Sequence, residues 1–344
     1  MKKLFTLLAA VLVLAGIYCI NCKAEDMINF VPADAEGVVF MDAARLLKLS
    51  HLQDLRQDNA EFNDGWKEFE AQLKSYGLTQ DDLPSQVMMF FKSDADTQNA
   101  GILALTKITE KKLLEILKIN KDKIDCTHKT FGGRKAYVIG QKGKEEDKAV
   151  VTYLKSNLVL ICDDDRAEDF CKNVGKTKNE KLMAADKKAD KKALMYVLFA
   201  NEKAAKPKAD SNTPQQNPMN VNPLENIDSA MIALDLTGKD QKDLSLKADL
   251  KCTDAQNAAQ MAMQLKTFVM IMGMQMGQDP ELGKAVTEAI KIDQKDKDIK
   301  VDISISEEIL GKLKELSKQK QQNAIAQGNA AGAKAPAKAP APAK

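Results

Sequence analysis

Histidine is nearly absent from this sequence, which has only His51 and His128 among 344 residues. Zinc sites commonly use two or three histidines, so this scarcity excludes histidine-rich centres and two-histidine metal motifs. The sequence also lacks a GxSxG nucleophile elbow and the spaced acids of a calcium loop. The glycine turn at residues 131–134 has no GK[ST] ending, which a phosphate loop needs. Little in the chain therefore indicates catalysis.

Long apolar runs are also missing, with one exception at the N-terminus. Lys2 and Lys3 precede the apolar run Leu4–Tyr18, and Cys22-Lys23-Ala24 ends the segment. This order is typical of a secretory signal peptide, and the run is shorter than the ~20 residues of a membrane-spanning helix. We expect residues 1–24 to be a signal peptide that is cleaved near Ala24. The mature protein is then periplasmic or extracellular, with no transmembrane span.

A lipid anchor is the rival interpretation of this leader. An acylated cysteine would follow small residues, but Tyr18 precedes Cys19 and Asn21 precedes Cys22. The sequence therefore favours a soluble exported protein that loses both leader cysteines on cleavage.

The body of the chain has no excess of basic residues. The formal net charge is +2, but three lysines lie in the leader and five in the segment 318–344, which has no acid, so the body carries −6. Phosphate binding needs clustered cations, and nucleic acid is therefore not an expected partner. The Ala-, Pro- and Lys-rich tail 318–344 is predicted to be disordered and able to contact an anionic surface polymer.

Short apolar runs and helical patterns alternate along the chain. Strands predicted at 87–91 and 102–105 precede a helix at 110–117, and the same order returns at 231–236, 244–250 and 255–265. In the second half, apolar and polar residues alternate with a period of two, which predicts an antiparallel sheet with one covered and one wetted face. The sequence predicts an α+β fold of two related units of antiparallel sheet covered by helices, which could be distant internal duplicates.

Composition suggests where these units meet. We expect a first unit at 25–175, a lysine-rich linker at 176–192 and a second unit at 193–317. A Pro-, Asn- and Gln-rich stretch at 203–223 is predicted to be a mobile loop inside the second unit.

Four cysteines remain after cleavage: Cys126, Cys162, Cys171 and Cys252. An oxidising compartment permits disulfides, and Cys162 ends a predicted strand while Cys171 lies in the helix after it. These two could form a disulfide if the helix folds back on its strand. Alternatively, they pack as small buried thiols.

Two groups of residues have the chemistry of a metal site. Cys126 and His128 lie on the same side of a predicted strand and could bind zinc or copper, or form a thiolate–imidazole pair, although a chance pairing is the simpler interpretation. Asp163 and Asp165 follow a strand and precede a helix, where carboxylates could bind Mg²⁺ or Ca²⁺. The same acids would also suit a helix N-terminus.

Methionine is concentrated between residues 261 and 276. Thioethers can bind Cu(I), but Met270, Met272, Met274 and Met276 are spaced by two and would diverge around a helix. We expect an ordinary apolar stripe in which Phe268 and Met272 pack in the core. A surface for a partner helix is the second interpretation.

The segment around the first predicted strand carries a short motif, Pro32-Ala33-Asp34-Ala35 followed by Val38-Val39-Phe40 and Asp42. It resembles the opening of certain exported bacterial proteins of unknown function. The resemblance implies the α+β fold and export from the cytoplasm, and it indicates no catalytic residues.

Together these features predict a non-catalytic binding or structural module of the bacterial cell envelope, without a cofactor. It would dock through a sheet face or the Met-rich helix onto another envelope protein or an anionic surface polymer. The alternative is a metal-dependent enzyme or a metal or lipid carrier. That function would use the Asp163–Asp165 cluster, the Cys126/His128 pair or an apolar cavity between sheet and helices.

Deletion of residues 319–344 should weaken retention of the mature protein on isolated envelopes at low salt, because the deletion removes most of the basic tail. The measurement is sedimentation with envelopes across a salt series. The intact protein should fall to the level of the truncated one at high salt, and equal retention of both at low salt would exclude the tail from binding.

Overall fold

The computed structural model describes residues 27–49, 56–57, 59–94, 97–143, 148–176, 179–201, 226–238, 241–276 and 279–316. The predicted signal peptide, the loop 203–223, the tail 318–344 and His51 lie outside these ranges.

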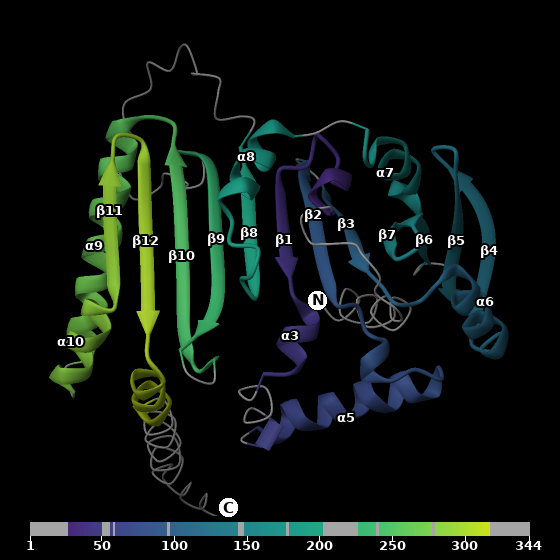
Figure 1. The fold of residues 1–344 in the computed structure, drawn as a ribbon, viewed down its shortest axis with the longest axis horizontal. Helices are drawn as coiled ribbons and strands as arrows, with labels where there is room; N and C mark the ends of the chain where they lie inside the picture. The colour runs from purple at the N-terminus through teal and green to yellow at the C-terminus, as the bar shows by residue number, and fades with distance from the viewer. Residues whose placement is uncertain are drawn as a thin grey trace, which may run out of the picture.

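Twelve antiparallel strands form one continuous sheet (Figure 1), in the order β11-β12-β10-β9-β8-β1-β2-β3-β7-β6-β5-β4. The predicted α+β class is confirmed. The strands are β1 (Gly37–Met41), β2 (Gln86–Asp94), β3 (Thr97–Leu105), β4 (Ile124–Phe131), β5 (Arg134–Gln141), β6 (Lys148–Lys155), β7 (Leu158–Asp163), β8 (Met195–Ala200), β9 (Ile227–Thr237), β10 (Asp243–Cys252), β11 (Ile290–Lys295) and β12 (Asp298–Ile305).

Helices lie on both faces of this sheet. Most begin at a side-chain cap: Asn59, Thr109, Asn179, Asp254 and Asp279 each accept a hydrogen bond from a backbone N–H of the first turn, which satisfies a donor that has no partner within the helix. The helices are α3 (Ala43–Leu47), α5 (Ala60–Ser75), α6 (Glu110–Ile119), α7 (Ala167–Asn173), α8 (Glu180–Lys188), α9 (Ala255–Gln275) and α10 (Pro280–Glu288), with short 3-10 turns η1 (Ile28–Phe30), η2 (Gln80–Asp82) and η3 (Asp164–Arg166), and residues 307–316 are also helical.

The two halves of the sheet have the same arrangement of strands outward from the centre. β1 pairs with β8, and outward from this pair the order is β1-β2-β3-β7 on one side and β8-β9-β10-β12 on the other. In each half a helix follows the third strand, α6 after β3 and α9 after β10, and both helices pack on the same face. The predicted correspondence of 87–117 with 231–265 is therefore also one of position in the sheet.

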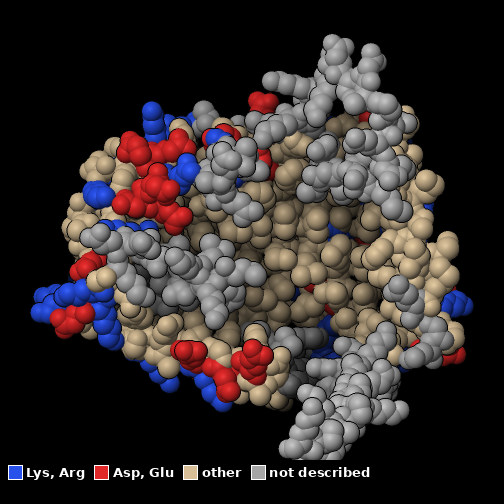
Figure 2. Space-filling model, turned by 180° about the vertical axis from the view of Figure 1, so that it is seen from behind, with Lys and Arg blue, Asp and Glu red and all other residues tan. Residues whose placement is uncertain are grey.

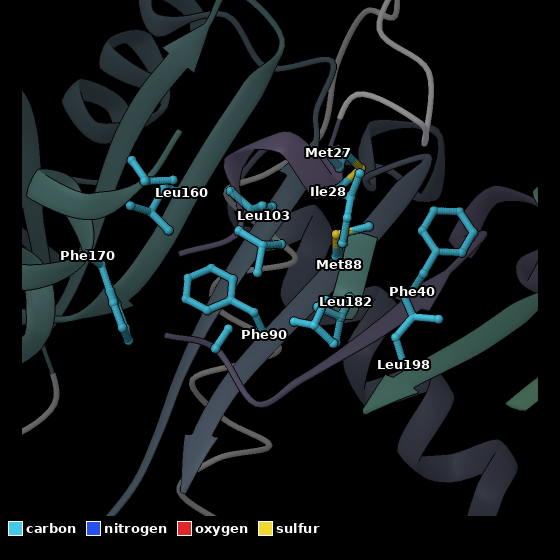
Figure 3. Close-up of a cluster of buried hydrophobic side chains, with 14 of the residues drawn as sticks. Met27, Ile28, Phe40, Met88, Phe90, Leu103, Leu160, Phe170, Leu182 and Leu198 are labelled. Atoms are coloured by element: carbon cyan, nitrogen blue, oxygen red, sulfur yellow. The ribbon is translucent and has the colours of Figure 1, made fainter. Parts of the chain in front are cut away.

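The larger core lies on one face, which we call the α8 side (Figure 3). It contains Phe40 of β1, Phe90 of β2 and Leu198 of β8, all buried, and it is covered by η1, α7 and α8. Phe40 stacks on Tyr196 with 4.6 Å between ring centroids. Phe90 meets Phe170 of α7 edge-on at 5.1 Å. The opposite face, which we call the α9 side, has two smaller cores, one beneath α6 and one beneath α9.

The lysine-rich range 176–192 contains α8. Leu182 and Ala185 of this helix are buried in the core of the α8 side, while its lysines lie outside. The Asn179 side chain caps the helix and also donates a hydrogen bond to the Ala35 carbonyl at 2.9 Å. The segment between the two predicted units is thus a helix that closes the core over β8 and β9.

One arginine joins the two halves of the chain. The Arg45 side chain in α3 binds the carboxylate of Asp235 at 2.8 Å and donates to the carbonyls of Lys192 at 2.7 Å and Leu236 at 3.0 Å. Its Nε donates to Oε1 of Gln241 at 3.1 Å. A planar guanidinium can serve several acceptors at once, and Arg45 therefore ties α3 to the turn between β9 and β10.

Arg45→Ala should lower the free energy of unfolding by about 2 kcal/mol, because the Asp235 carboxylate and two carbonyls lose their donor. Urea denaturation measures the change. Lys67→Ala, which removes an exposed ion pair with Asp64, should change stability by less than about 0.5 kcal/mol. Equal effects of the two substitutions would contradict a joining role for Arg45.

Candidate functional site

Cys126 and His128 lie on edge strand β4, where they pair with Ile139 and Tyr137 of β5. The His128 ring meets the Tyr137 ring edge-on at 4.9 Å. Cys126 is half-buried against the core beneath α6, and burial raises the pKa of its thiol. A neutral thiol is a poor nucleophile and must lose its proton to bind a metal.

A polar cluster that the sequence did not indicate lies beside this pair. The Tyr137 hydroxyl and the Lys135 ammonium both donate to the carboxylate of Glu110, the first residue of α6. The hydrogen bond from Tyr137, followed by that from Lys135, lowers the pKa of Glu110. Glu110 could be recognised from the sequence as the acid after the helix cap Thr109. Its two partners depend on strand register and gave no sequence signal.

The Asp163–Asp165 cluster lies at the end of β7 and in η3. Asp164 binds the Lys129 ammonium at 3.2 Å, and Asp165 lies 3.7 Å from the Arg166 guanidinium. Burial, followed by the charge of Asp165, raises the pKa of Asp163. Within the described ranges no three His, Cys, Asp or Glu side chains come together as a metal site would require. Asp163 and Asp165 are therefore not brought together with Cys126 and His128.

Cys162 and Cys171 are both buried in the core of the α8 side. Burial raises the pKa of Cys162, and the nearby Cys171 adds to this shift. The Cys171 sulfur lies 3.6 Å from the Thr152 hydroxyl. Helix α7, which carries Cys171, packs against β7, and the disulfide between the two cysteines stays a prediction.

The α9 side carries a broad apolar surface between its two small cores. Strand register places one set of large apolar side chains on this face. None of them is buried and none belongs to any of the three cores. We call this set the central apolar face; it comprises Val39, Met41, Val87, Met89, Phe91, Met195, Val197, Phe199, Ile232, Leu234, Leu244, Leu246, Ile303 and Ile305.

Seen from this side, the centre of the molecule is hollowed and almost free of charged side chains (Figure 2). A monomer rarely leaves a continuous apolar surface of more than a few hundred Å² uncovered unless it binds something there. The central apolar face is the strongest candidate for a binding surface among the described residues.

Helix α9 differs from its sequence-based expectation. Ala258 and Ala262 are buried, and Met261 and Leu265 pack against the same core, as the predicted stripe requires. The expectation for Phe268 was wrong, because its side chain is 59% exposed. Residues 258, 262 and 265 form the side of α9 that packs on the core. Phe268 lies at the edge of that side, and its side chain is not part of the core.

No protein-family model matches this chain, and a comparison with curated proteins finds no match. Among solved structures, three crystal forms of the treponemal protein TP0453 are similar to it. Form I has 11% identity and a TM-score of 0.42 over 83% of this chain and 94% of that chain. Form IV has 11% identity and a TM-score of 0.42, with 84% of this chain and 96% of that chain covered. Form III has 12% identity and a TM-score of 0.43, with 83% of this chain and 96% of that chain covered. A likeness at this level carries no argument about function.

Tyr137→Phe should destabilise the protein by about 1 kcal/mol at neutral pH, a reduced value because the Glu110 side chain is partly exposed. The folded state lowers the pKa of Glu110 below 4.5. The stabilisation from the hydrogen bond between Tyr137 and Glu110 is therefore fully present above the pKa that Glu110 has in the unfolded chain. It is lost as the pH falls through the lower pKa that Glu110 has in the folded protein. The difference between wild type and variant should shrink as pH falls below 4.5.

Tyr153→Phe is the matched control for this prediction, since the Tyr153 hydroxyl donates to the Ile108 carbonyl at 2.9 Å. A carbonyl does not titrate, so the cost of this substitution should not depend on pH. Denaturant unfolding between pH 3 and 7 measures both variants, and parallel profiles would contradict the assigned role of Glu110.

Proposed function

We propose that this protein is an exported, non-catalytic binding module of the bacterial cell envelope, and that its central apolar face binds a hydrocarbon chain. The single observation behind this proposal is the set of apolar side chains on the α9 side that no described helix buries. The signal-peptide pattern of residues 1–24 supports the address. None of the helices in the described ranges has the length and apolar composition for a membrane crossing.

The chemistry of the face suits a ligand with no polar groups along its length. The floor consists of aliphatic, thioether and phenyl side chains, and the strands beneath are paired with one another through their backbones. Such a floor offers no side-chain hydrogen bond to a peptide or a sugar. A hydrocarbon chain needs none, and each buried methylene contributes about 0.8 kcal/mol.

The size of the face suits such a chain. It extends from β2 to β12, across six neighbouring strands, or roughly 24 Å at the usual strand spacing. A single acyl chain spans half of a bilayer core, or about 15 Å. The face is therefore wide enough to hold one extended chain lying across the strands.

Two features of the floor favour adaptable packing. Met41, Met89 and Met195 are flexible and polarizable, which suits a ligand of variable shape. At one end, the Phe91 ring lies directly over Gly37, where a Cβ atom would come 2.1 Å from the ring. The glycine thus lets the ring lie flat against the sheet, which lowers the floor at that point.

Titration of the mature chain, beginning at Glu25, with parinaric acid tests the proposal, since this fluorescent fatty acid brightens when it leaves water. We expect saturable brightening, and Ile232→Lys should weaken the affinity at least tenfold because it places a charge on the floor. Ile232 is already 37% exposed, so the substitution should leave the fold intact.

Ser304→Lys adds the same charge to an exposed position on the opposite face of β12, and it should bind like the wild type. Mass spectrometry of a lipid extract from protein purified out of its native envelope provides a second readout. The absence of brightening with the wild-type chain, or equal affinity of both lysine variants, would contradict the proposal.

A further inference from the structure

The outer side of α9 is a second apolar surface, distinct from the central apolar face. Met263, Met270 and Met274 are 64%, 63% and 66% exposed, and Phe268 and Ile271 are 59% and 42% exposed. These five make up more than half of the large apolar side chains exposed in the described ranges. They are concentrated on one helix, which indicates a contact surface.

The exposed methionines follow the spacing of a helix-pairing seam. Met263, Thr267, Met270 and Met274 are separated by four, three and four residues, as in the apolar positions of a coiled coil. The Thr267 hydroxyl donates to the Met263 carbonyl of its own helix at 2.9 Å. The seam therefore presents its methyl groups and leaves no side-chain donor without a partner.

The inner side of α9 is already in use. Ala258 and Ala262 pack into the core, and Gly273 lies so close to α10 that an added Cβ would meet the Thr287 methyl at 2.7 Å. The seam points away from both contacts. It can therefore meet another helix without any change in the fold.

We propose that α9 pairs with α9 of a second copy of this chain, antiparallel and about a two-fold axis between residues 268 and 269. This register places Met263 opposite Met274 of the second copy, and Thr267 opposite Met270. Each contact then occurs twice, as an isologous interface requires.

The charges near the seam favour this partner. Lys266 is the single charged residue of α9, and it lies on the flank where α10 packs. The antiparallel register moves each Lys266 to the level of residue 271 in the second copy, about 7.5 Å along the axis from its counterpart. Helix α10 contains Glu281, Lys284 and Glu288. The Glu288 carboxylate lies 3.8 Å from the Lys284 ammonium, and the helix as a whole keeps a net negative charge that is complementary to Lys266. An interfacial membrane helix would instead have a row of basic residues on its polar face, whereas α9 has Lys266 alone.

Cysteine pairs test the register. In the Met263→Cys/Met274→Cys variant, each new thiol faces its counterpart across the axis, so mild oxidation should produce a disulfide-linked dimer. The single variant Met263→Cys should remain uncrosslinked, because the two copies of residue 263 are about 16 Å apart along the axis. A mixture of the two single-cysteine variants should crosslink to a dimer of one chain of each kind. The wild-type chain, whose Cys126 is half-buried, reports any background.

Sedimentation equilibrium tests the pairing itself. The mature wild-type chain should approach dimer mass as its concentration rises, and Met270→Lys should weaken dimerisation at least tenfold. Ile119→Lys, at a position on α6 that is 74% exposed, should leave it unchanged. Monomer mass at every concentration, crosslinking of the Met263→Cys variant alone, or binding to phosphatidylcholine vesicles without dimer formation would each overturn the proposal.

Discussion

The pairing of β1 with β8 holds the two halves of the molecule in a single sheet. Val38 lies opposite Leu198 and Phe40 opposite Tyr196 across this pair, and all four are buried in the core of the α8 side. Backbone hydrogen bonds and the stacked rings thus act at the same place. Because the two halves form one sheet, the helices of both halves lie on the same two faces. Which strands are covered on each face therefore depends on the positions of the helices from both halves.

That cover is unequal on the two faces. On the α8 side, η1, α7 and α8 lie over the centre of the sheet and produce the largest core. On the α9 side, α6 and α9 each cover one outer part, and the side chains that the central strands present on this side belong to neither core. The proposed hydrocarbon site is a consequence of this arrangement, since the central strands are apolar on both sides. The candidates for metal chemistry lie elsewhere, at β4 and at the end of β7.

The sequence predicted the outer strands better than the central ones. In β10 and β12 the polar side alternates with the apolar side, so Leu250 and Ile299 could be assigned to the covered face. In β1 the run Val38-Val39-Phe40 is apolar on both faces, and such a run cannot show which face has a helix over it.

Helices were harder to predict where side chains of one kind serve two roles. The lysines of α8 suggested a linker, although Leu182 and Ala185, three positions apart, form its buried side. Phe268 was expected in the core because it continues the apolar stripe of Ala258, Ala262 and Leu265 at helical spacing, and the spacing alone does not show where the core beneath the helix ends. The Tyr137–Glu110 contact joins residues 27 positions apart, and it depends on a strand register that local patterns do not fix.

The polar side of β10, β12 and β11 carries a regular array of charge. Lys247 lies opposite Asp302, which lies opposite Lys291; the next row is Asp249, Lys300 and Asp293, and the third is Lys251, Asp298 and Lys295. Neighbours of opposite sign attract across strands. A shift of β11 along β12 by two residues would keep the apolar side chains inside but place lysine opposite lysine. The array thus distinguishes the native alignment from a two-residue misalignment that hydrophobic burial would tolerate.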